Sequence, residues 1–383
     1  MKVYLDNAAT SFPKPEEVYR AVDLCLRYKC GNPGRSGHKM ALEASRIIFK
    51  TRDKIAEFFG IDDSAQVIFT SSATEALNLG IKGLLKKGDH VITSTMEHNS
   101  VLRPLHRLEK EGIISVSRVK SNIEGYISQE MISKKIKPET KLVVITHASN
   151  IVGTINPIME IGTLSRNKNI IFMVDAAQTA GALPINVKED NIDLLAAPGH
   201  KSLLGPQGTG FLYIKKGLKI LPLKEGGTGS QSHEENQPAI LPERYEAGTL
   251  NTPGIAGLGA AVSFLQKIRV ENIRKYEMEL TEYLLLQLKE IPGIHIYGPN
   301  NAVLQMPVVS FEVNNIDSAE LGSILSEKYN IMTRVGLHCA PQAHKTIKTY
   351  PRGTLRLSPG YYNTQKEIDY TIDCIKKIIL KKV

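Results

Sequence analysis

The chain has 383 residues, of which 42% are hydrophobic, so it is long enough to bury a large core and to form two domains. Its formal charge of +9 comes from Lys and Arg residues spread along the sequence, and it contains no Trp. Spread charge without a stacking platform argues against nucleic-acid binding. No segment reaches the roughly 20 apolar residues of a membrane-spanning helix, and the first residues do not resemble a signal peptide. We therefore expect neither export nor membrane insertion.

The cysteines are sparse and point to a reducing compartment. Cys25, Cys30, Cys339 and Cys374 are the only ones in the chain. So few cysteines in so long a chain cannot build a disulfide framework, which predicts a cytoplasmic protein.

From about residue 65, apolar β-rich runs alternate with helical stretches. We expect strands at Val67–Thr70, Val91–Thr93, Leu142–Thr146 and Ile170–Asp175, with helices that include Thr74–Leu85 and Ile158–Lys168. Repeated alternation of strand and helix predicts a parallel sheet with helices on both faces, which is an α/β fold.

The pattern of expected helices and strands changes after Gly248. Before it, the pattern predicts strands at Leu194–Ala197 and Gly210–Tyr213 and an exposed glycine-rich loop at Gly226–Pro238. After it, the expected elements in order are helices Ile255–Ile268 and Glu271–Glu290, strand Pro307–Glu312, helix Ser318–Tyr329, strand Thr354–Ser358 and helix Thr364–Lys381. This part predicts a second, smaller α+β domain.

Lys201 and Asp175 form the strongest chemical signal. Each follows or ends an apolar strand, which is where open α/β sheets bind their ligands. Alone, a loop Lys is usually a surface charge and an Asp at a strand end is usually a turn residue. Together they suit pyridoxal phosphate, which needs a Lys amine to form a Schiff base and a carboxylate to keep its pyridine nitrogen protonated.

Two further motifs lie at predicted strand ends. The run Ser71–Glu75 opens a helix, whose free backbone N–H groups and dipole favour a phosphate, although Thr74 could equally be a simple N-cap. His98 follows the next strand and could stack on a cofactor ring and transfer protons, although a structural role is the common alternative.

Cys339 and Arg356 are candidates in the second domain. Cys339 lies in a loop beside Arg334 and His338, which could stabilise a thiolate, although a lone Cys is more commonly a small buried residue. Zinc binding through His338, Cys339 and His344 matches no familiar spacing, so we expect no metal. Arg356 is the one charge in a short strand and could clamp a substrate carboxylate or form an ordinary ion pair.

Several motifs, in order along the chain, resemble those of fold type I class V aminotransferases, and specifically the cysteine desulfurase/selenocysteine lyase family. The motifs are Tyr4–Thr10, Asn32–His38, Thr74–Asn78, Glu97–Asn99, His147–Asn150, Asp175–Gln178, Gly199–Lys201 and Glu246–Thr249. The resemblance covers nearly the whole chain. Leu337 departs from it, because many members carry a second His at that position.

The resemblance implies a fold type I architecture: a large, mostly parallel-sheet domain with helices on both faces, and a smaller α+β C-terminal domain. It divides the chain into an N-terminal segment (1–14) that packs on the small domain, a large pyridoxal-phosphate domain (15–260), and a small domain (261–383) that carries Cys339 and Arg356. It also implies a role for each matching residue. Lys201 would hold the cofactor, Asp175 would pair with its pyridine nitrogen, Gln178 would contact its ring oxygen and His98 would stack on its ring. The cofactor phosphate would be bound by Ala73, Thr74 and His200. The amino-acid substrate would be surrounded by Asn150, Arg334 and Arg356, and its entrance would be lined by Arg35 and His38.

The implied activity is release of sulfur from L-cysteine, with Cys339 carrying a persulfide to an acceptor protein or a small thiol. Thr249 would reach the cofactor phosphate of a second subunit, so the resemblance implies a homodimer with shared sites. A selenocysteine lyase acting on L-selenocysteine, or another class V enzyme such as a transaminase, stays open as an alternative.

Overall fold

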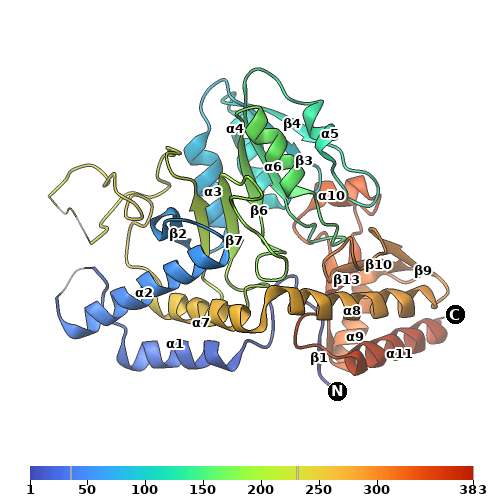
Figure 1. Cartoon of the computed structure of the whole chain (residues 1–383). Helices are drawn as coiled ribbons and strands as arrows, with labels where there is room; N and C mark the ends of the chain where they lie inside the picture. The colour runs from blue at the N-terminus through green and yellow to red at the C-terminus, as the bar shows by residue number, and fades with distance from the viewer. Residues whose placement is uncertain (35–36, 230, 232, 383) are drawn as a thin grey trace.

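The computed structural model describes residues 1–34, 37–229, 231 and 233–382, and its centre is a seven-stranded sheet (Figure 1). Across the sheet the strands follow the order β2-β8-β7-β6-β5-β3-β4. Neighbouring strands run parallel except β8, which is antiparallel to both β7 and β2. The strand bounds are β2 (Val67–Thr70), β3 (His90–Ser94), β4 (Ser115–Val119), β5 (Thr140–Thr146), β6 (Ile171–Asp175), β7 (Leu194–Pro198) and β8 (Gly210–Ile214).

Helices cover both faces of this sheet, as the alternation predicted. Along β5, Leu142 and Val144 pack with α3 (Ala73–Leu84) and α4 (Asn99–Lys110). The alternate residues Val143 and Ile145 belong to a second cluster with residues of α2 (Lys39–Phe58), α6 (Ile158–Asn167) and α7 (Thr252–Ile268). Because successive strand residues point to opposite faces, a strand buried on both sides reads as a continuous apolar run.

A second, four-stranded antiparallel sheet has the order β12-β13-β10-β9. Its strands are β9 (Ile294–Tyr297), β10 (Val309–Val313), β12 (Arg334–Gly336) and β13 (Thr354–Leu357), and it packs with α8 (Val270–Lys289), α9 (Ser318–Tyr329) and α11 (Gln365–Lys382). The N-terminal strand β1 (Val3–Tyr4) pairs in parallel with β11 (Ile331–Met332). Both chain ends therefore lie beside this smaller part of the molecule (Figure 1).

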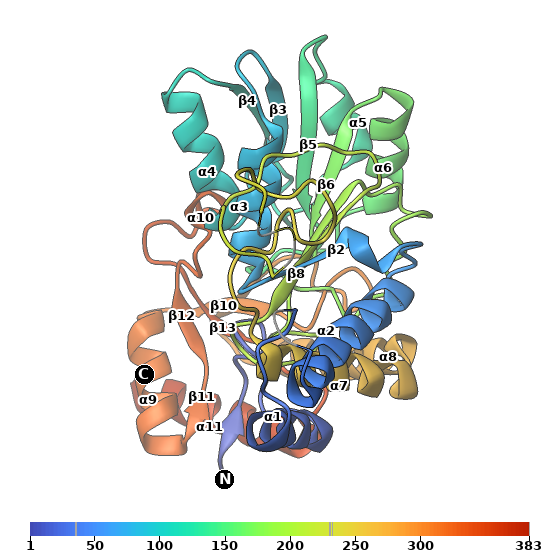
Figure 2. The same cartoon turned by 90° about the vertical axis from the view of Figure 1, so that its left-hand side faces the viewer.

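The division at residue 260 stays a prediction. Helix α7 runs through that position and packs against α1 (Glu16–Tyr28) and α2, which lie together with it at the base of the large sheet in both ribbon views (Figure 2). The hydrophobic cluster of the smaller part takes in Val3 and Leu5 from the N-terminal segment and then begins at Leu280 in α8.

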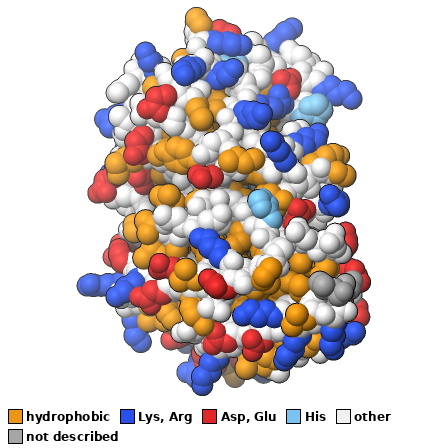
Figure 3. Space-filling view, turned by 90° about the vertical axis from the view of Figure 1, so that its right-hand side faces the viewer, with side chains coloured by type: hydrophobic (Ala, Val, Ile, Leu, Met, Phe, Trp, Pro, Cys, Tyr) orange, Lys and Arg blue, Asp and Glu red, His pale blue; other side chains and the backbone are white. Residues whose placement is uncertain are grey.

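The elements expected from the sequence are confirmed within a few residues at either end, and the described residues of Gly226–Pro238 contain no helix or strand. The sequence analysis did not place β4, whose residues are mostly half-buried at the sheet edge, nor the short helices α5 (Gln129–Ser133) and α10 (Pro341–Thr346). It also named no helix at α1, α2 or α4 and no strand at β9 or β12. Within the described residues, no helix is both long and apolar enough to cross a membrane. On the face in Figure 3, Lys and Arg are interspersed with Asp and Glu.

Candidate active site

Most of the polar residues singled out from the sequence meet in one cavity beside the carboxyl ends of β5, β6 and β7. Its volume is about 210 Å³, and residues from both parts of the chain line it. Parallel strands end at the same edge of a sheet, which explains why motifs far apart in the sequence converge here. The predicted residues on its wall are Ala73, Thr74, His98, Asn150, Asp175, Gln178, His200, Lys201, Arg334, Cys339 and Arg356.

Lys201 lies in a tight turn that follows β7. The turn is closed by hydrogen bonds from Leu204 N to Lys201 O (2.8 Å) and from Gly205 N to Gly199 O (2.7 Å). A Cβ at Gly199 would come 2.1 Å from Thr209 Oγ1, so only glycine fits there without displacement. Burial lowers the pKa of the Lys201 amine to about 8, and the nearby Asp175 carboxylate opposes this shift. Near neutral pH, part of the population therefore carries the nucleophilic neutral amine.

Asp175 is the last residue of β6 and is only 3% exposed. Its Oδ1 accepts a hydrogen bond from Ala177 N at 2.9 Å. Burial raises the pKa of this carboxyl group, while the Ala177 N–H and Lys201 lower it. Gln178, which follows, donates from Nε2 to the carbonyl oxygen of Ala8 at 3.1 Å.

The start of α3 forms one end of the cavity. Ser72 is its N-cap, since its side chain accepts from Glu75 N at 3.3 Å, so Thr74 does not have the capping role that the sequence left open. The Thr74 hydroxyl instead lies 2.7 Å from Ser100 Oγ. Nearby, His200 has a buried Nδ1 that finds no hydrogen-bond partner among the described residues, and burial lowers the pKa of His200 to about 4. Free backbone N–H groups and a neutral, unpartnered ring nitrogen suit a phosphate group.

His98 is the N-cap of α4. Its Nδ1 accepts from Ser100 N at 3.1 Å and lies 2.8 Å from Ser100 Oγ. Burial is the main reason that the pKa of His98 falls to about 4, with Lys201 and Arg334 adding to the effect. The ring is therefore neutral, and because Nδ1 is an acceptor the proton resides on Nε2.

Cys339 presents an exposed side chain to the cavity from a firmly held loop. Both His338 and Cys339 have left-handed backbone conformations, with φ of 45° and 62°. Asn150 Nδ2 donates to His338 O at 2.8 Å, and Asn99 N donates to Cys339 O at 2.9 Å. These contacts offset the strain of two successive left-handed residues other than glycine.

His338 is buried 3.3 Å from Thr354 Oγ1 and next to the His344 ring. Burial lowers the pKa of His338 far below its ordinary value, so the ring is neutral. His338 therefore places no positive charge beside Cys339, whereas Arg334 lines the same cavity as Cys339. In the described part of the chain, no group of three or more His, Cys, Asp or Glu side chains is arranged to hold a metal ion.

Arg356 is nearly fully buried and has definite partners. Its Nη2 lies 2.7 Å from Asp6 Oδ1, and its Nη1 donates to Asn150 O at 2.8 Å. Its Nε has no hydrogen-bond partner in the part of the chain that the structure describes. The guanidinium is thus fixed by Asp6 and the chain at Asn150, and it keeps unused N–H donors.

Two residues assigned to the site by resemblance, His38 and Thr249, do not reach this cavity within one chain. His38 caps α2 by accepting from Ala41 N at 3.3 Å. Thr249 lines a separate hollow of about 510 Å³, together with Asn32 and Arg52. Arg35 lies outside the described residues.

The sequence reasoning missed three residues that support the site. Asp6 is the counter-ion of Arg356, and Ser100 links His98 to Thr74. Glu97 is fully buried and accepts from Ser94 Oγ at 2.5 Å, and burial raises its pKa to about 8, so it is protonated at neutral pH. All three lie inside or directly beside motifs that were noticed, but a motif does not reveal contacts between side chains.

Comparisons with known proteins assign the chain to a family of enzymes that agrees with the fold and the site described above. The family model described as "Aminotransferase class-V" matches residues 3–371, and the chain belongs to this family, whose enzymes use pyridoxal phosphate. The chain is 36% identical to a probable cysteine desulfurase of Methanothermobacter thermautotrophicus, over 98% of this chain and 94% of that protein. It is 35% identical to the cysteine desulfurase IscS of Dictyoglomus turgidum, over 99% and 95%. The apo structure of a Thermococcus onnurineus cysteine desulfurase superposes with a TM-score of 0.93 at 32% identity, covering 99% of this chain and 95% of that one.

Proposed function

We propose that this protein is a pyridoxal-phosphate-dependent cysteine desulfurase that converts L-cysteine to L-alanine and holds the sulfur as a persulfide on Cys339. The observation that carries the proposal is the shared cavity of Lys201, Asp175 and Cys339. A buried amine, a buried carboxylate and an exposed thiol around one space serve this reaction together. A transaminase has no use for the thiol.

The residues present fit pyridoxal phosphate. The unpartnered Nδ1 of His200 and the start of α3 at Ala73 and Thr74 suit the phosphate. Asp175 suits the pyridine nitrogen, Gln178 the ring oxygen, and the neutral face of His98 the ring. When bound, the cofactor supplies an electron sink that stabilises negative charge on the substrate carbon next to the amino group.

The protein's own groups bind and orient the substrate. Arg356 offers its remaining N–H donors to the cysteine carboxylate, with Asn150 and Arg334 close by. Lys201, whose pKa is about 8, would accept the proton from the substrate carbon next to the amino group and return a proton to that carbon when alanine forms.

Cys339 then attacks the substrate's sulfur atom. A bond forms between the two sulfurs, the bond between substrate sulfur and carbon breaks, and the carbon takes the electron pair and a proton to become the methyl group of alanine. The thiolate form of Cys339 is the nucleophile in this attack. An acceptor protein or a small thiol would take the sulfur next.

The test is the variant Cys339→Ala. We expect it to bind pyridoxal phosphate with unchanged visible absorbance and to release no sulfide from cysteine. Cys30→Ala, which removes another exposed thiol, is the matched control and should retain full activity. Alanine formed at the normal rate by Cys339→Ala would refute the desulfurase assignment. Repeating the assay with selenocysteine distinguishes a selenocysteine lyase from a cysteine desulfurase. A selenocysteine lyase can release selenium without Cys339, because selenium leaves its carbon more readily than sulfur does.

We also propose a homodimer in which Thr249 serves the partner's cavity. The hollow beside Thr249 adjoins α2, whose exposed apolar side chains include Phe49 (61%), Met40 (47%) and Leu42 (47%). Exposed apolar groups of this size are typical of an interface. Mixing inactive Lys201→Ala subunits with Thr249→Ala subunits should restore activity, since hybrid dimers regain one intact site. Absence of any recovery in proven hybrids would contradict shared sites.

All four cysteines carry free thiols, which agrees with the reducing cytoplasm that we propose as the location.

A further inference from the structure

The peptide groups on either side of Lys201 are held by residues 10–14. The carbonyl oxygen of His200 accepts from Ser11 N at 3.0 Å and from Thr10 Oγ1 at 3.1 Å. Lys14 Nζ donates to the same oxygen at 2.8 Å. The next carbonyl oxygen, that of Lys201 itself, accepts from Ser11 Oγ at 2.9 Å. The N-terminal segment therefore fixes the backbone both before and after the Cα atom that carries the Lys201 side chain.

Lys14 also determines which way the Ser11 hydroxyl points. Its Nζ lies 2.7 Å from Ser11 Oγ. An ammonium group can only donate, so Ser11 Oγ accepts from Lys14 and its single proton is left to donate. Lys201 O, at 2.9 Å, is the nearer acceptor, since His200 O lies at 3.2 Å. Hydrogen bonds thus run from the Lys14 ammonium through Ser11 to the backbone of Lys201.

The surroundings of Lys14 are those of a buried donor and not of a surface charge. Its side chain is half-buried, and burial lowers its pKa to about 8. Among the described residues no carboxylate forms an ion pair with it, so its charge is directed at the oxygens of His200 and Ser11. Charged donors form the stronger hydrogen bonds in proteins.

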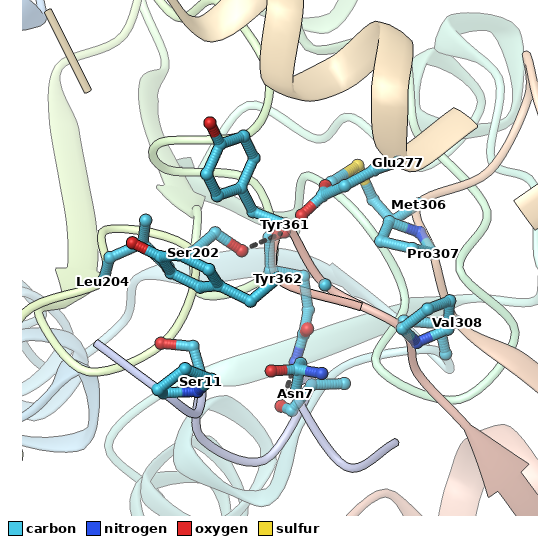
Figure 4. A pocket seen from close by; sticks show the side chains of 15 residues that line it. Asn7, Ser11, Ser202, Leu204, Glu277, Met306, Pro307, Val308, Tyr361 and Tyr362 are labelled. Atoms are coloured by element: carbon cyan, nitrogen blue, oxygen red, sulfur yellow. Dashed lines mark hydrogen bonds between the residues drawn. The ribbon is translucent and has the colours of Figure 1, made fainter. Parts of the chain in front are cut away.

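The turn after Lys201 is also held by a hydrogen bond from Ser202. Ser202 Oγ donates to Gln178 O at 3.3 Å, and Ser11 and Ser202 line one small pocket (Figure 4), which shares Ala8 and Gln178 with the active-site cavity. Because the side chains of His200 and Lys201 leave from this one clamped stretch, a shift of the stretch would displace both together.

We propose that Lys14 is a positioning residue that sets the place of the Lys201 amine and thereby the affinity of the protein for pyridoxal phosphate. The proposal rests on the proposed function, because it assumes that Lys201 and His200 hold this cofactor.

The test compares apoprotein variants in a titration with pyridoxal phosphate, followed by visible absorbance and by borohydride trapping on Lys201. Lys14→Met keeps the apolar stem and removes the ammonium, and we expect its dissociation constant to rise about tenfold, as for loss of a charged hydrogen bond. Lys14→Arg keeps a charged donor and should recover part of this loss. Ser11→Ala should weaken binding too, and combining it with Lys14→Met should add less than the sum of the two effects, since both break one chain of bonds.

Lys2→Met is the matched control, because it removes the same charge from the same segment. Lys2 is exposed and its Nζ lies over the Phe12 ring at 5.4 Å, and among the described residues its side chain forms no hydrogen bond to residues 200 and 201. We expect the control to bind the cofactor as the unaltered protein does. A Lys14→Met protein that binds it equally well overturns the proposal, even if the thermal midpoint of its apo form falls. Failure of the unaltered protein to bind any cofactor would instead refute the proposed function.

Discussion

The buried ion pair between Arg52 and Glu246 tests how the long irregular segment before α7 is attached to the large sheet. The two side chains meet through two parallel hydrogen bonds of 2.7 and 2.8 Å, and the residues are only 5% and 8% exposed. Glu246 Oε1 also accepts from Phe69 N at 2.6 Å, and the Arg52 guanidinium lies 4.5 Å from the centre of the Phe69 ring. Glu246 thus joins the segment that carries Thr249 to α2 and β2.

The perturbation is Glu246→Gln, which leaves the Arg52 charge buried without its counter-charge. Breaking a buried pair in this way costs about 3 to 5 kcal/mol, because the remaining charge stays desolvated. We therefore expect the free energy of unfolding to fall by about that amount in urea titrations followed by circular dichroism and fluorescence. Coincident transitions by both probes are needed before a single value is assigned.

The matched control is Glu16→Gln in α1. Glu16 forms an ion pair with Arg20 at 3.3 Å, but these side chains are 66% and 74% exposed. An exposed pair of this kind contributes about 0 to 1 kcal/mol, so the control should unfold almost as the unaltered protein does. A double variant with apolar residues, Arg52→Met with Glu246→Leu, should recover much of the loss, since no charge is then buried. Equal stability of Glu246→Gln and Glu16→Gln would refute the reasoning.

Two predictions concern the site itself. Burial lowers the pKa of Lys201 to about 8, and only the neutral amine is nucleophilic. The rate at which the apoprotein gains visible absorbance with pyridoxal phosphate should therefore rise with pH until about 8 and then level off. A rate that does not change with pH through this range would contradict the assignment of Lys201. Arg356→Lys keeps the charge but loses the planar pair of donors, so the KM for cysteine should rise about tenfold while cofactor absorbance is unchanged. An unaltered KM in steady-state assays of alanine formation would show that Arg356 does not bind the substrate carboxylate.

The sequence by itself determined the alternation of strands and helices and the polar residues that end the strands. Buried strands read as continuous apolar runs, and the polar residue that follows such a run must lie at the sheet edge, so the pattern alone was enough to place Asp175 and Lys201 together. Local patterns did not identify the partly buried edge strand β4 or the short helix α10, and the sequence analysis also named no helix at α1 or α2.

Tertiary structure alone decided the direction of β8, which runs against its neighbours, and the contacts between distant segments. Asp6 meets Arg356 across 350 residues, and Lys14 reaches the backbone of His200 across 186. The left-handed backbone of Cys339 is likewise held by Asn99 and Asn150, which come from other parts of the chain. Propensity and periodicity act over a few neighbouring residues, whereas hydrogen bonds and burial, which set orientation and pKa, arise only once the segments have packed.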